Sequence, residues 1–248
     1  MTIHYHGLPL TPEVMLLDLA GKHVCISFAT KRDAQVETCL RLMQSIMFDN
    51  GAFTIHQQGG SLDVDAYYAW LAPMLRAPHW AVIPDVIGGR EDAQRKMVGT
   101  WPFSRLRGAP VWHLGLSLDY LVELATDWLR ICFGSSEDYW QVGSPAWRGR
   151  MHEAFAALED AGSEPEIHGL RMMNEAGKWP LASVDSVNVA RNYKDREDMP
   201  FLHPNFLAMK IYEFSLQLFR VTLLFLRGSR FRRTLKCLSI SMNGTQKW

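Results

Sequence analysis

The segment Phe48-Asp49-Asn50-Gly51-Ala52-Phe53 closes the short apolar run of residues 45–49 with an acid and a turn. A run of this length, bounded by turn residues, is typical of a buried strand. Five further runs have polar endings, over residues 80–85, 110–113, 130–135, 166–171 and 183–188, and an apolar run over residues 23–29 precedes them all. In a (β/α)8 barrel the catalytic groups lie at the carboxyl ends of parallel strands. The repetition therefore predicts an α/β fold, a TIM-type barrel with its active site at these strand ends.

Segments with helical periodicity lie between these runs. Apolar residues recur at i, i+3, i+4 and i+7 from Val36, Tyr67 and Leu118, and a fourth helix is predicted to begin at Pro145 and to end before Gly162. Strands that alternate with helices fit both a doubly wound sheet and a barrel. No GxGxxG or P-loop sequence follows the early strands, and a length of 248 residues suits one barrel, so we favour the barrel.

Charge divides the chain into two parts although the formal net charge is zero. Residues 201–248 contain eight Lys or Arg and one acid, whereas residues 1–200 contain 18 basic and 25 acidic residues. We predict a barrel domain over residues 1–200 and an apolar-basic tail over residues 201–248. Two interpretations of the tail are open. The basic run of residues 227–236 binds phosphates, or the tail is a truncated or frame-shifted end that leaves the eighth strand–helix unit incomplete.

Composition also sets the expected compartment. Hydrophobic residues make up 48% of the chain and charged residues 21%, as in a soluble globular protein. The four cysteines form no CxxC pair, residues 1–10 do not form a signal peptide, and the apolar stretch 214–226 is too short to span a membrane. We therefore expect a cytoplasmic protein with reduced thiols, without a metal site, a cofactor or a membrane partner.

Three aspartates stand in or at the end of the apolar runs: Asp49, Asp85 and Asp185. Taken alone, Asp49-Asn50-Gly51 is typical of a turn, because Asn and Gly tolerate positive φ. Asp185 lies inside a run, where an unpaired carboxylate would be costly to bury. Acids at three strand ends would open into one mouth, which suits nucleophilic and acid–base chemistry at a glycosidic bond.

These segments resemble the motifs of the tRNA-guanine transglycosylase superfamily, and within it the queuine tRNA-ribosyltransferase-like branch of phages and bacteria that directs 7-deazaguanine bases into DNA. Residues 49–53 are similar to the family's Asp-Ser-Gly-Gly-(Tyr/Phe) motif. Residues 185–192 resemble a shortened form of its Asp-Cys-Val…Thr-Arg-Asn-Ala-Arg segment. The resemblance covers about residues 28–192, and its two aspartate motifs are more specific together than apart.

The resemblance implies roles for the matching residues. Asp185 would be the nucleophile that attacks the anomeric carbon, and Asp49 would transfer the proton of the base. Asp85 would bind the guanine edge, and Phe53 would stack on the base. The other residues implied to bind substrate are His113 in the place of a glutamine, Gly134 and Ser135 as backbone contacts to the base, and His168 or Leu170 in the place of a methionine. Apart from the resemblance, Arg191 is either a phosphate contact beside Asp185 or a strand-end salt bridge.

Several other residues that could bind substrate are predicted to be structural instead. Arg171 is expected to have a structural role. The nine tryptophans fall mostly on helical or strand faces and are expected in the core. His4 and His6 lie near the amino terminus, where surface or capping roles are more common than a place at the barrel mouth.

The family's zinc site of three cysteines and a histidine is missing, which favours DNA over tRNA as the nucleic-acid partner. The expected activity is that of a pentosyltransferase: guanine is replaced by a 7-deazaguanine base through a covalent aspartyl–sugar intermediate. Accessory proteins of a DNA-modification system would be further partners. Two alternatives remain open, an N-glycosidic hydrolase that uses the same two carboxylates with water, and a catalytically idle nucleic-acid-binding relative.

Overall fold

The computed structural model describes residues 1–186. The predicted substrate residue Arg191, the end of the motif at residues 185–192, the predicted boundary at residue 200 and the tail of residues 201–248 lie outside the described residues. The fold and the site below are therefore those of residues 1–186.

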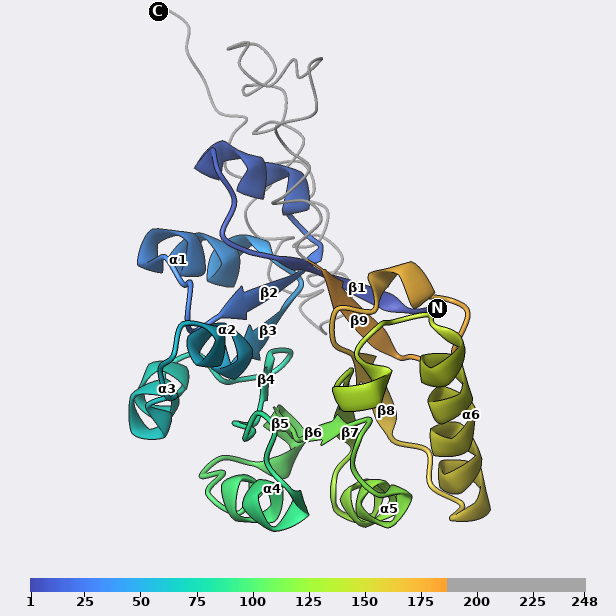
Figure 1. Cartoon of the computed structure of the whole chain (residues 1–248). Helices are drawn as coiled ribbons and strands as arrows, with labels where there is room; N and C mark the ends of the chain where they lie inside the picture. The colour runs from blue at the N-terminus through green and yellow to red at the C-terminus, as the bar shows by residue number, and fades with distance from the viewer. Residues whose placement is uncertain (187–248) are drawn as a thin grey trace, which may run out of the picture. The chain divides into compact units, whose positions relative to one another are not determined.

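Parallel strands form a nearly closed barrel, and helices lie between successive strands (Figure 1). The strand order is β5-β4-β3-β2-β1-β9-β8-β7-β6. The strands are β1 (Ile3–Gly7), β2 (His23–Ser27), β3 (Ser45–Asp49), β4 (Trp80–Val82), β5 (Gly108–Ala109), β6 (Val111–His113), β7 (Arg130–Gly134), β8 (Glu166–Gly169) and β9 (Ser183–Ser186). The α/β class and the parallel barrel are thus confirmed, and the architecture is consistent with the TIM type, with nine strands in place of the eight expected.

The ninth strand arises at Pro110, which separates β5 from β6. Proline has no backbone N–H to donate to a ladder, so it interrupts the strand. Its carbonyl still accepts a hydrogen bond from the N–H of Cys132 at 2.8 Å. β5 pairs with β4 and β6 pairs with β7, so a single residue joins the two ends of the sheet and brings the barrel close to closure.

The four predicted helices are confirmed, and the fourth has the expected ends. The Ser117 side chain caps one helix by accepting from the N–H of Tyr120, and Ser144 caps another, which ends before Gly162 at φ 63°. The helices are α1 (Asp33–Leu42), α2 (Ala52–Gln57), α3 (Val64–Leu71), α4 (Glu91–Val98), α5 (Leu118–Asp127) and α6 (Pro145–Asp160), with 3₁₀ helices η1 (Glu13–Leu19), η2 (Arg105–Arg107), η3 (Glu137–Tyr139) and η4 (Met173–Glu175).

Strand β1 was not among the predicted strands. Only Tyr5 and Gly7 are buried in it, so it carries no apolar run. It lies between β2 and β9, and its register places Tyr5 opposite both His23 and Asp185. Pairing on both sides therefore forms this strand, and the same pairing joins β9, which carries Asp185, to the rest of the barrel.

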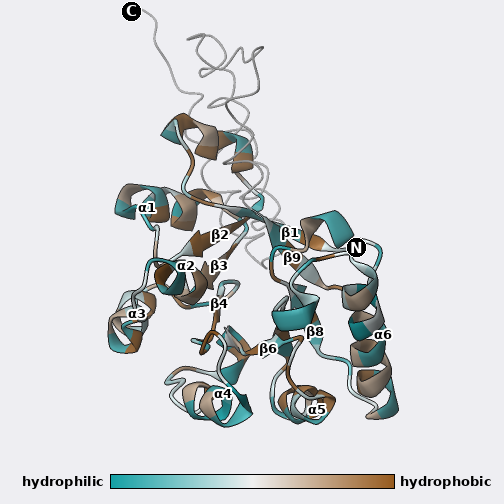
Figure 2. Ribbon diagram, viewed as in Figure 1, coloured by the Kyte–Doolittle hydropathy of each residue, from teal (hydrophilic) through white to brown (hydrophobic). Residues whose placement is uncertain are grey.

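Within residues 1–186, two apolar clusters stabilise the fold. The larger lies outside the barrel, where α5 and α6 pack against the strands around Trp112, Phe133 and Trp147. The smaller fills the barrel interior and consists of Tyr5, Cys25, Met47, Trp80, Val82, Ala109, Val111 and Cys132. Figure 2 shows the hydrophobic character of β2 and β3 beside the mixed character of the outer helices. The interior cluster forms a solid floor below the carboxyl ends of the strands.

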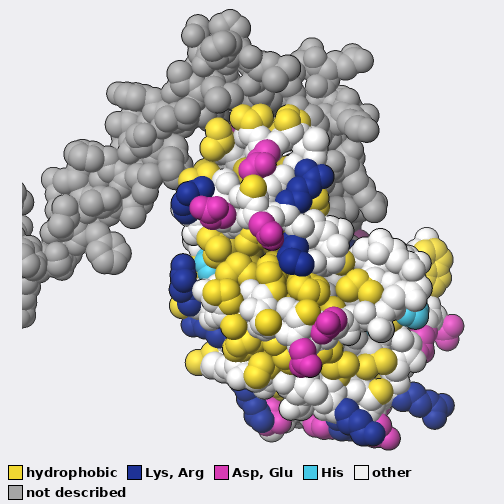
Figure 3. Space-filling model, turned by 90° about the vertical axis from the view of Figure 1, so that its left-hand side faces the viewer, with side chains coloured by type: hydrophobic (Ala, Val, Ile, Leu, Met, Phe, Trp, Pro, Cys, Tyr) yellow, Lys and Arg dark blue, Asp and Glu magenta, His cyan; other side chains and the backbone are white. Residues whose placement is uncertain are grey.

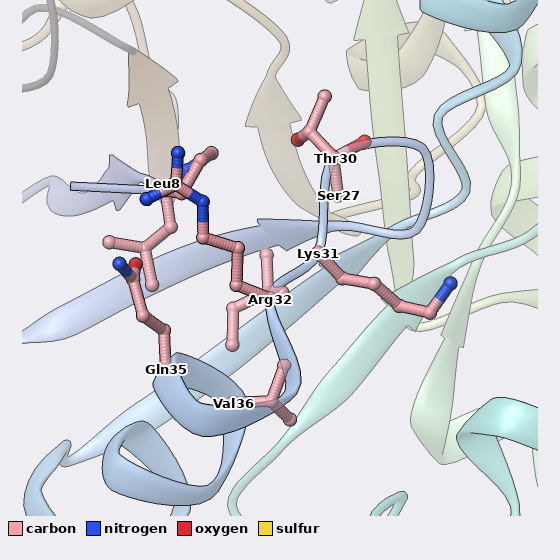
Figure 4. Close-up of a pocket in the computed structure, with 9 residues that line it drawn as sticks. Leu8, Ser27, Thr30, Lys31, Arg32, Gln35 and Val36 are labelled. Atoms are coloured by element: carbon pink, nitrogen blue, oxygen red, sulfur yellow. The ribbon is translucent and has the colours of Figure 1, made fainter. Parts of the chain in front are cut away.

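The connection from β1 to η1 is held by Gln35, which is 2% exposed. Its side-chain amide donates to the Leu10 carbonyl at 2.7 Å and accepts from the Leu10 N–H at 3.0 Å. Gln35, Arg32 and Leu8 surround a hollow of about 10 Å³ (Figure 4). A hollow of that size holds at most about one water molecule, so it is not a ligand site.

The side of the molecule formed by α1 and α3 has charged side chains of both signs (Figure 3). Figure 3 shows the side of α1 and α3, where basic and acidic side chains are interspersed around a group of hydrophobic ones. A surface of mixed sign generates no broad positive field. This side of the molecule is therefore not marked by charge as a polyanion-binding surface.

Candidate active site

The carboxyl ends of the strands surround one cavity of about 310 Å³. This volume is at the lower end of the range for small-molecule sites. Its floor is apolar and is made by Met47, Val82, Val111 and Leu170. The other lining residues come mostly from the strand ends and the segments that follow them: Asp49, Asn50, Gly51, Phe53, Thr54, Asp85, Ile87, His113, Gly134, Ser135, Trp140, Val142, Arg171 and Asp185.

The predicted strand-end residues meet at this cavity. Asp49, Asp85, His113, Ser135 and Asp185 all line it, as expected of one shared mouth. Two further predicted residues line it as well, namely Phe53 and Gly134. The convergence is a finding of the structure, whereas the chemical role of each residue stays a prediction.

Asp85 is held between two polar side chains. Its Oδ1 accepts a hydrogen bond from Asn50 Nδ2 at 3.0 Å, and its Oδ2 lies 2.9 Å from His113 Nε2. A carboxylate only accepts, so His113 donates to it through Nε2. Gly134 leaves space for this ring, because a Cβ there would lie 3.1 Å from His113 Nδ1. The pair therefore presents a carboxylate and an imidazole in a fixed orientation.

The Asp49-Asn50-Gly51 segment is both a turn and a part of the site. Asn50 Oδ1 accepts from the Ala52 N–H at 2.8 Å, while its Nδ2 also donates to the Ile83 carbonyl at 3.0 Å. Gly51 has φ 75°, and a Cβ there would lie 2.6 Å from the Ala29 Cβ, so only glycine fits. Sequence alone indicated a turn at Asn50, but not its bond to Asp85.

Asp49, the last residue of β3, has a carboxyl group with a raised pKa. The pKa of its carboxyl is raised to about 6: burial is the largest cause, the negative charges of Asp185 and Asp85 act in the same direction, and the Ser27 hydroxyl and the Arg171 charge oppose the rise. A carboxyl with this pKa changes its protonation state close to neutral pH. It can therefore serve as a proton donor and acceptor.

Asp185 is 8% exposed and is bound through one oxygen. Its Oδ1 accepts a hydrogen bond from the Arg171 backbone N–H at 2.6 Å. The same oxygen lies 3.5 Å from His168 Nε2. Its Oδ2 accepts no hydrogen bond from the other residues that the structure describes.

Of the two residues predicted to contact the base in the place of a methionine, His168 does not lie at the cavity. Its side chain is fully buried and does not line the cavity. Its Nδ1 lies 2.8 Å from Ser183 Oγ, and its ring packs against Trp80 with centroids 5.1 Å apart. The reason is strand alternation: His168 and Leu170 both face inward, and His168 lies one layer deeper than Leu170. Leu170, the alternative considered above, does line the cavity.

Arg171 lines the cavity, although the sequence analysis predicted a structural role for it. It has φ 59°, a conformation uncommon for a residue other than glycine. Its guanidinium carbon lies 4.0 Å from the centroid of the Phe53 ring. Such strain occurs most often at functional sites.

Trp140 also departs from the expectation of a core position. It lies just after η3, is 70% exposed, and lines the cavity. Phe53, with 39% exposure, is the other exposed aromatic ring of the lining. Helical and strand periodicity gave no information about Trp140, because it belongs to the loop between β7 and α6.

Over residues 1–186, no group of three or more His, Cys, Asp or Glu is placed to hold a metal ion. In the same part of the chain, no helix has both the length and the apolar character needed to cross a membrane.

The roles of these residues rest on the motifs and on the geometry. Asp49, Asp85 and Asp185 face one cavity, and each has different partners. No family model matches the chain, and no curated protein matches it either.

Proposed function

We propose that this protein exchanges guanine in nucleic acid, with DNA preferred over tRNA, for a 7-deazaguanine base through a covalent aspartyl–sugar intermediate. The observation that carries the proposal is the convergence of three carboxylates with unlike environments on one cavity. Base exchange at a nucleoside needs a nucleophile, a proton-transfer group and a group that recognises guanine. The three aspartates can divide these tasks among them.

Asp185 is the proposed nucleophile. With Oδ1 held by the Arg171 N–H, Oδ2 attacks C1′ of the nucleotide as the bond from C1′ to the guanine nitrogen breaks. The electrons of that bond leave with guanine, and the oxocarbenium character at C1′ is stabilised by the carboxylate. The product is an ester between Asp185 and the sugar, which the incoming base then displaces.

Asp49 is the proposed proton-transfer group. A carboxyl with a pKa of about 6 is partly protonated near neutral pH, so it can donate a proton to the departing guanine. The resulting carboxylate then accepts a proton from the incoming base as that base attacks C1′. The different environments of Asp49 and Asp185 support the separation of these two roles.

Asp85 is proposed to recognise guanine. Each of its oxygens accepts one hydrogen bond from the protein and retains a lone pair. These lone pairs suit the N1–H and the exocyclic amine of guanine, a pair of donors that adenine lacks. A site built around such hydrogen bonds discriminates strongly against an analogue that cannot form them.

The base must leave the helical stack to reach this cavity. Extrusion of a nucleotide into a pocket is the general solution for enzymes that act on a base. Phe53 and Trp140 at the cavity provide aromatic faces for the extruded base and for a neighbour. Aromatic platforms of this kind support single-stranded or unstacked substrates.

The direct test is an exchange assay with labelled guanine. Purified protein is incubated with guanine-containing DNA or with tRNA, and incorporation and release of guanine are both measured. Incorporation into DNA that exceeds incorporation into tRNA supports the proposal. Release of guanine without incorporation supports the hydrolase alternative, and the absence of both from either nucleic acid contradicts the proposal.

A further inference from the structure

Arg171 occupies the place where a base would stack. Its guanidinium is planar, and its carbon lies 4.0 Å from the Phe53 ring centroid, a distance suited to a cation–π contact. Both side chains line the cavity. A planar base cannot use this part of the Phe53 face until the guanidinium moves.

The backbone of Arg171 is fixed although its side chain is exposed. The N–H donates to Asp185 Oδ1 at 2.6 Å, and φ is 59°. Within residues 1–186 the side chain forms no ion pair or hydrogen bond, and its close contact is with the Phe53 ring. The guanidinium can therefore leave the ring while the bond to Asp185 persists.

Among the described residues that line the cavity, Arg171 is the only Lys or Arg, and three aspartates also lie there. Its charge lowers the pKa of Asp49 and so favours the carboxylate form in the empty cavity. Asp185 and Asp85 act in the opposite direction. Departure of the guanidinium would favour the protonated form of Asp49 that the departing guanine needs.

We propose that the Arg171 guanidinium occupies the stacking face of Phe53 in the empty cavity until a planar heterocycle displaces it. Arg171 thereby lowers the affinity for every flat ligand and restricts the stacking face to ligands that can replace the cation. This inference rests on the proposed function for the identity of the natural ligand, a guanine or 7-deazaguanine base. The displacement itself depends only on the Arg171–Phe53 contact.

The test measures binding of free guanine and free adenine by calorimetry in four forms of the full chain: wild type, Arg171→Gly, Phe53→Leu and the double variant. Glycine adopts φ 59° without strain and keeps the backbone N–H that binds Asp185. Arg148→Ala is the matched control, because Arg148 is an exposed arginine that does not line this cavity.

Arg171→Gly is expected to bind guanine about two- to thirtyfold more tightly than wild type, the range that corresponds to loss of one cation–π contact. The gain should disappear in the Phe53→Leu background, and Arg148→Ala should bind as wild type does. A structural role for Arg171 would not make the gain depend on Phe53. Unchanged or weaker guanine binding by Arg171→Gly, or a gain that persists without Phe53, overturns the inference.

The same titrations separate this inference from the proposed function. A wild-type preference for guanine over adenine supports the function, and its absence counts against the function. A gain in Arg171→Gly for both bases, without any preference for guanine, supports displacement while the function fails. Guanine preference without a gain overturns displacement alone, and failure of all four forms to bind either base overturns both.

Discussion

The two ends of the barrel interior use their polar side chains differently. In the lower layer the Tyr5 hydroxyl lies 3.0 Å from Ser45 Oγ and accepts from Trp80 Nε1 at 2.8 Å. In the upper layer Asp49, Asp85 and Asp185 face a cavity of about 310 Å³. The lower groups satisfy one another, whereas the upper ones keep lone pairs for a ligand. A polar residue inside a barrel therefore indicates a site only where its hydrogen-bonding capacity is not already used by the protein.

His168 lies at the boundary between the two layers. Its Nδ1 is paired with Ser183 in the lower layer, and its Nε2 lies 3.5 Å from Asp185 Oδ1 in the upper layer. The difference between the layers can be tested by substitutions in each. Upper-layer changes should alter chemistry or binding, and lower-layer changes should alter stability.

The largest effect is expected for Asp185→Ala. It removes the proposed nucleophile, and we expect both guanine exchange and any covalent protein–DNA adduct to fall by at least about a thousandfold. Adducts are measured on denaturing gels with guanine-containing DNA, and thermal unfolding controls for loss of the fold. Adduct formation by Asp185→Ala at the wild-type rate would show that the nucleophile is a different residue.

Asp49→Asn should have a smaller and pH-dependent effect. The amide keeps the shape of the side chain but cannot transfer a proton, so we expect exchange to fall by about 10²- to 10⁴-fold while an adduct still forms slowly. In wild type the proton donor is the protonated form, and burial sets its pKa at about 6. Adduct formation should therefore decrease as pH rises through about 6.

The pH profile of Asp49→Asn provides the corresponding control. This variant should lack the decrease near pH 6, because residue 49 no longer titrates. Rates are measured from pH 5 to pH 8 under single-turnover conditions. An identical profile in wild type and variant would assign the proton transfer to another group.

Much of the barrel could be predicted because its signals are local. Residues 45–49 combine apolar side chains, a terminal acid and a turn, and they form β3 with the predicted bounds. Pro110 has no backbone N–H to donate, which the sequence alone shows. The pairing of β5 and β6 with different neighbours, however, depends on the closed sheet. β1 escaped prediction because its formation depends on its two partner strands and not on its own hydrophobicity.

The site was only partly predictable for a related reason. Strand ends can be identified from sequence, and five of them do meet at the cavity. The depth of His168 could have been read from its spacing of two residues before Leu170, since alternate residues occupy successive layers. The position of Arg171 over Phe53 could not, because it depends on φ 59° and on contact between segments far apart in the chain.

Trp140→Ala tests whether the upper layer extends to its rim. The exposed ring can stack on a base next to the extruded one, and such stacking contributes about 1–3 kcal/mol per base. We expect affinity for single-stranded DNA to fall by about five- to a hundredfold, while binding of free guanine changes little. Affinity is measured by fluorescence anisotropy at fixed salt, with Trp140→Phe as a control that keeps an aromatic face. Equal affinities for wild type and Trp140→Ala would exclude this ring from the DNA interface.

The smallest effect, and the one that tests the lower layer, is expected for Tyr5→Phe. The change removes a buried hydroxyl that bonds to Ser45 and Trp80, so two polar groups lose a partner while the shape of the ring is kept. Loss of a buried hydrogen-bond partner costs about 1–3 kcal/mol, and His23 Nδ1 at 2.7 Å still partners Ser45, which places the expected loss near the lower limit. The loss is measured by urea denaturation of the full chain, and exchange is assayed where the variant is folded. Exchange should match wild type, since Tyr5 is 4% exposed and does not line the cavity. A variant with normal stability and a large loss of exchange would contradict this division of the two layers. It would place chemistry in the lower layer, whose polar groups already bond to one another.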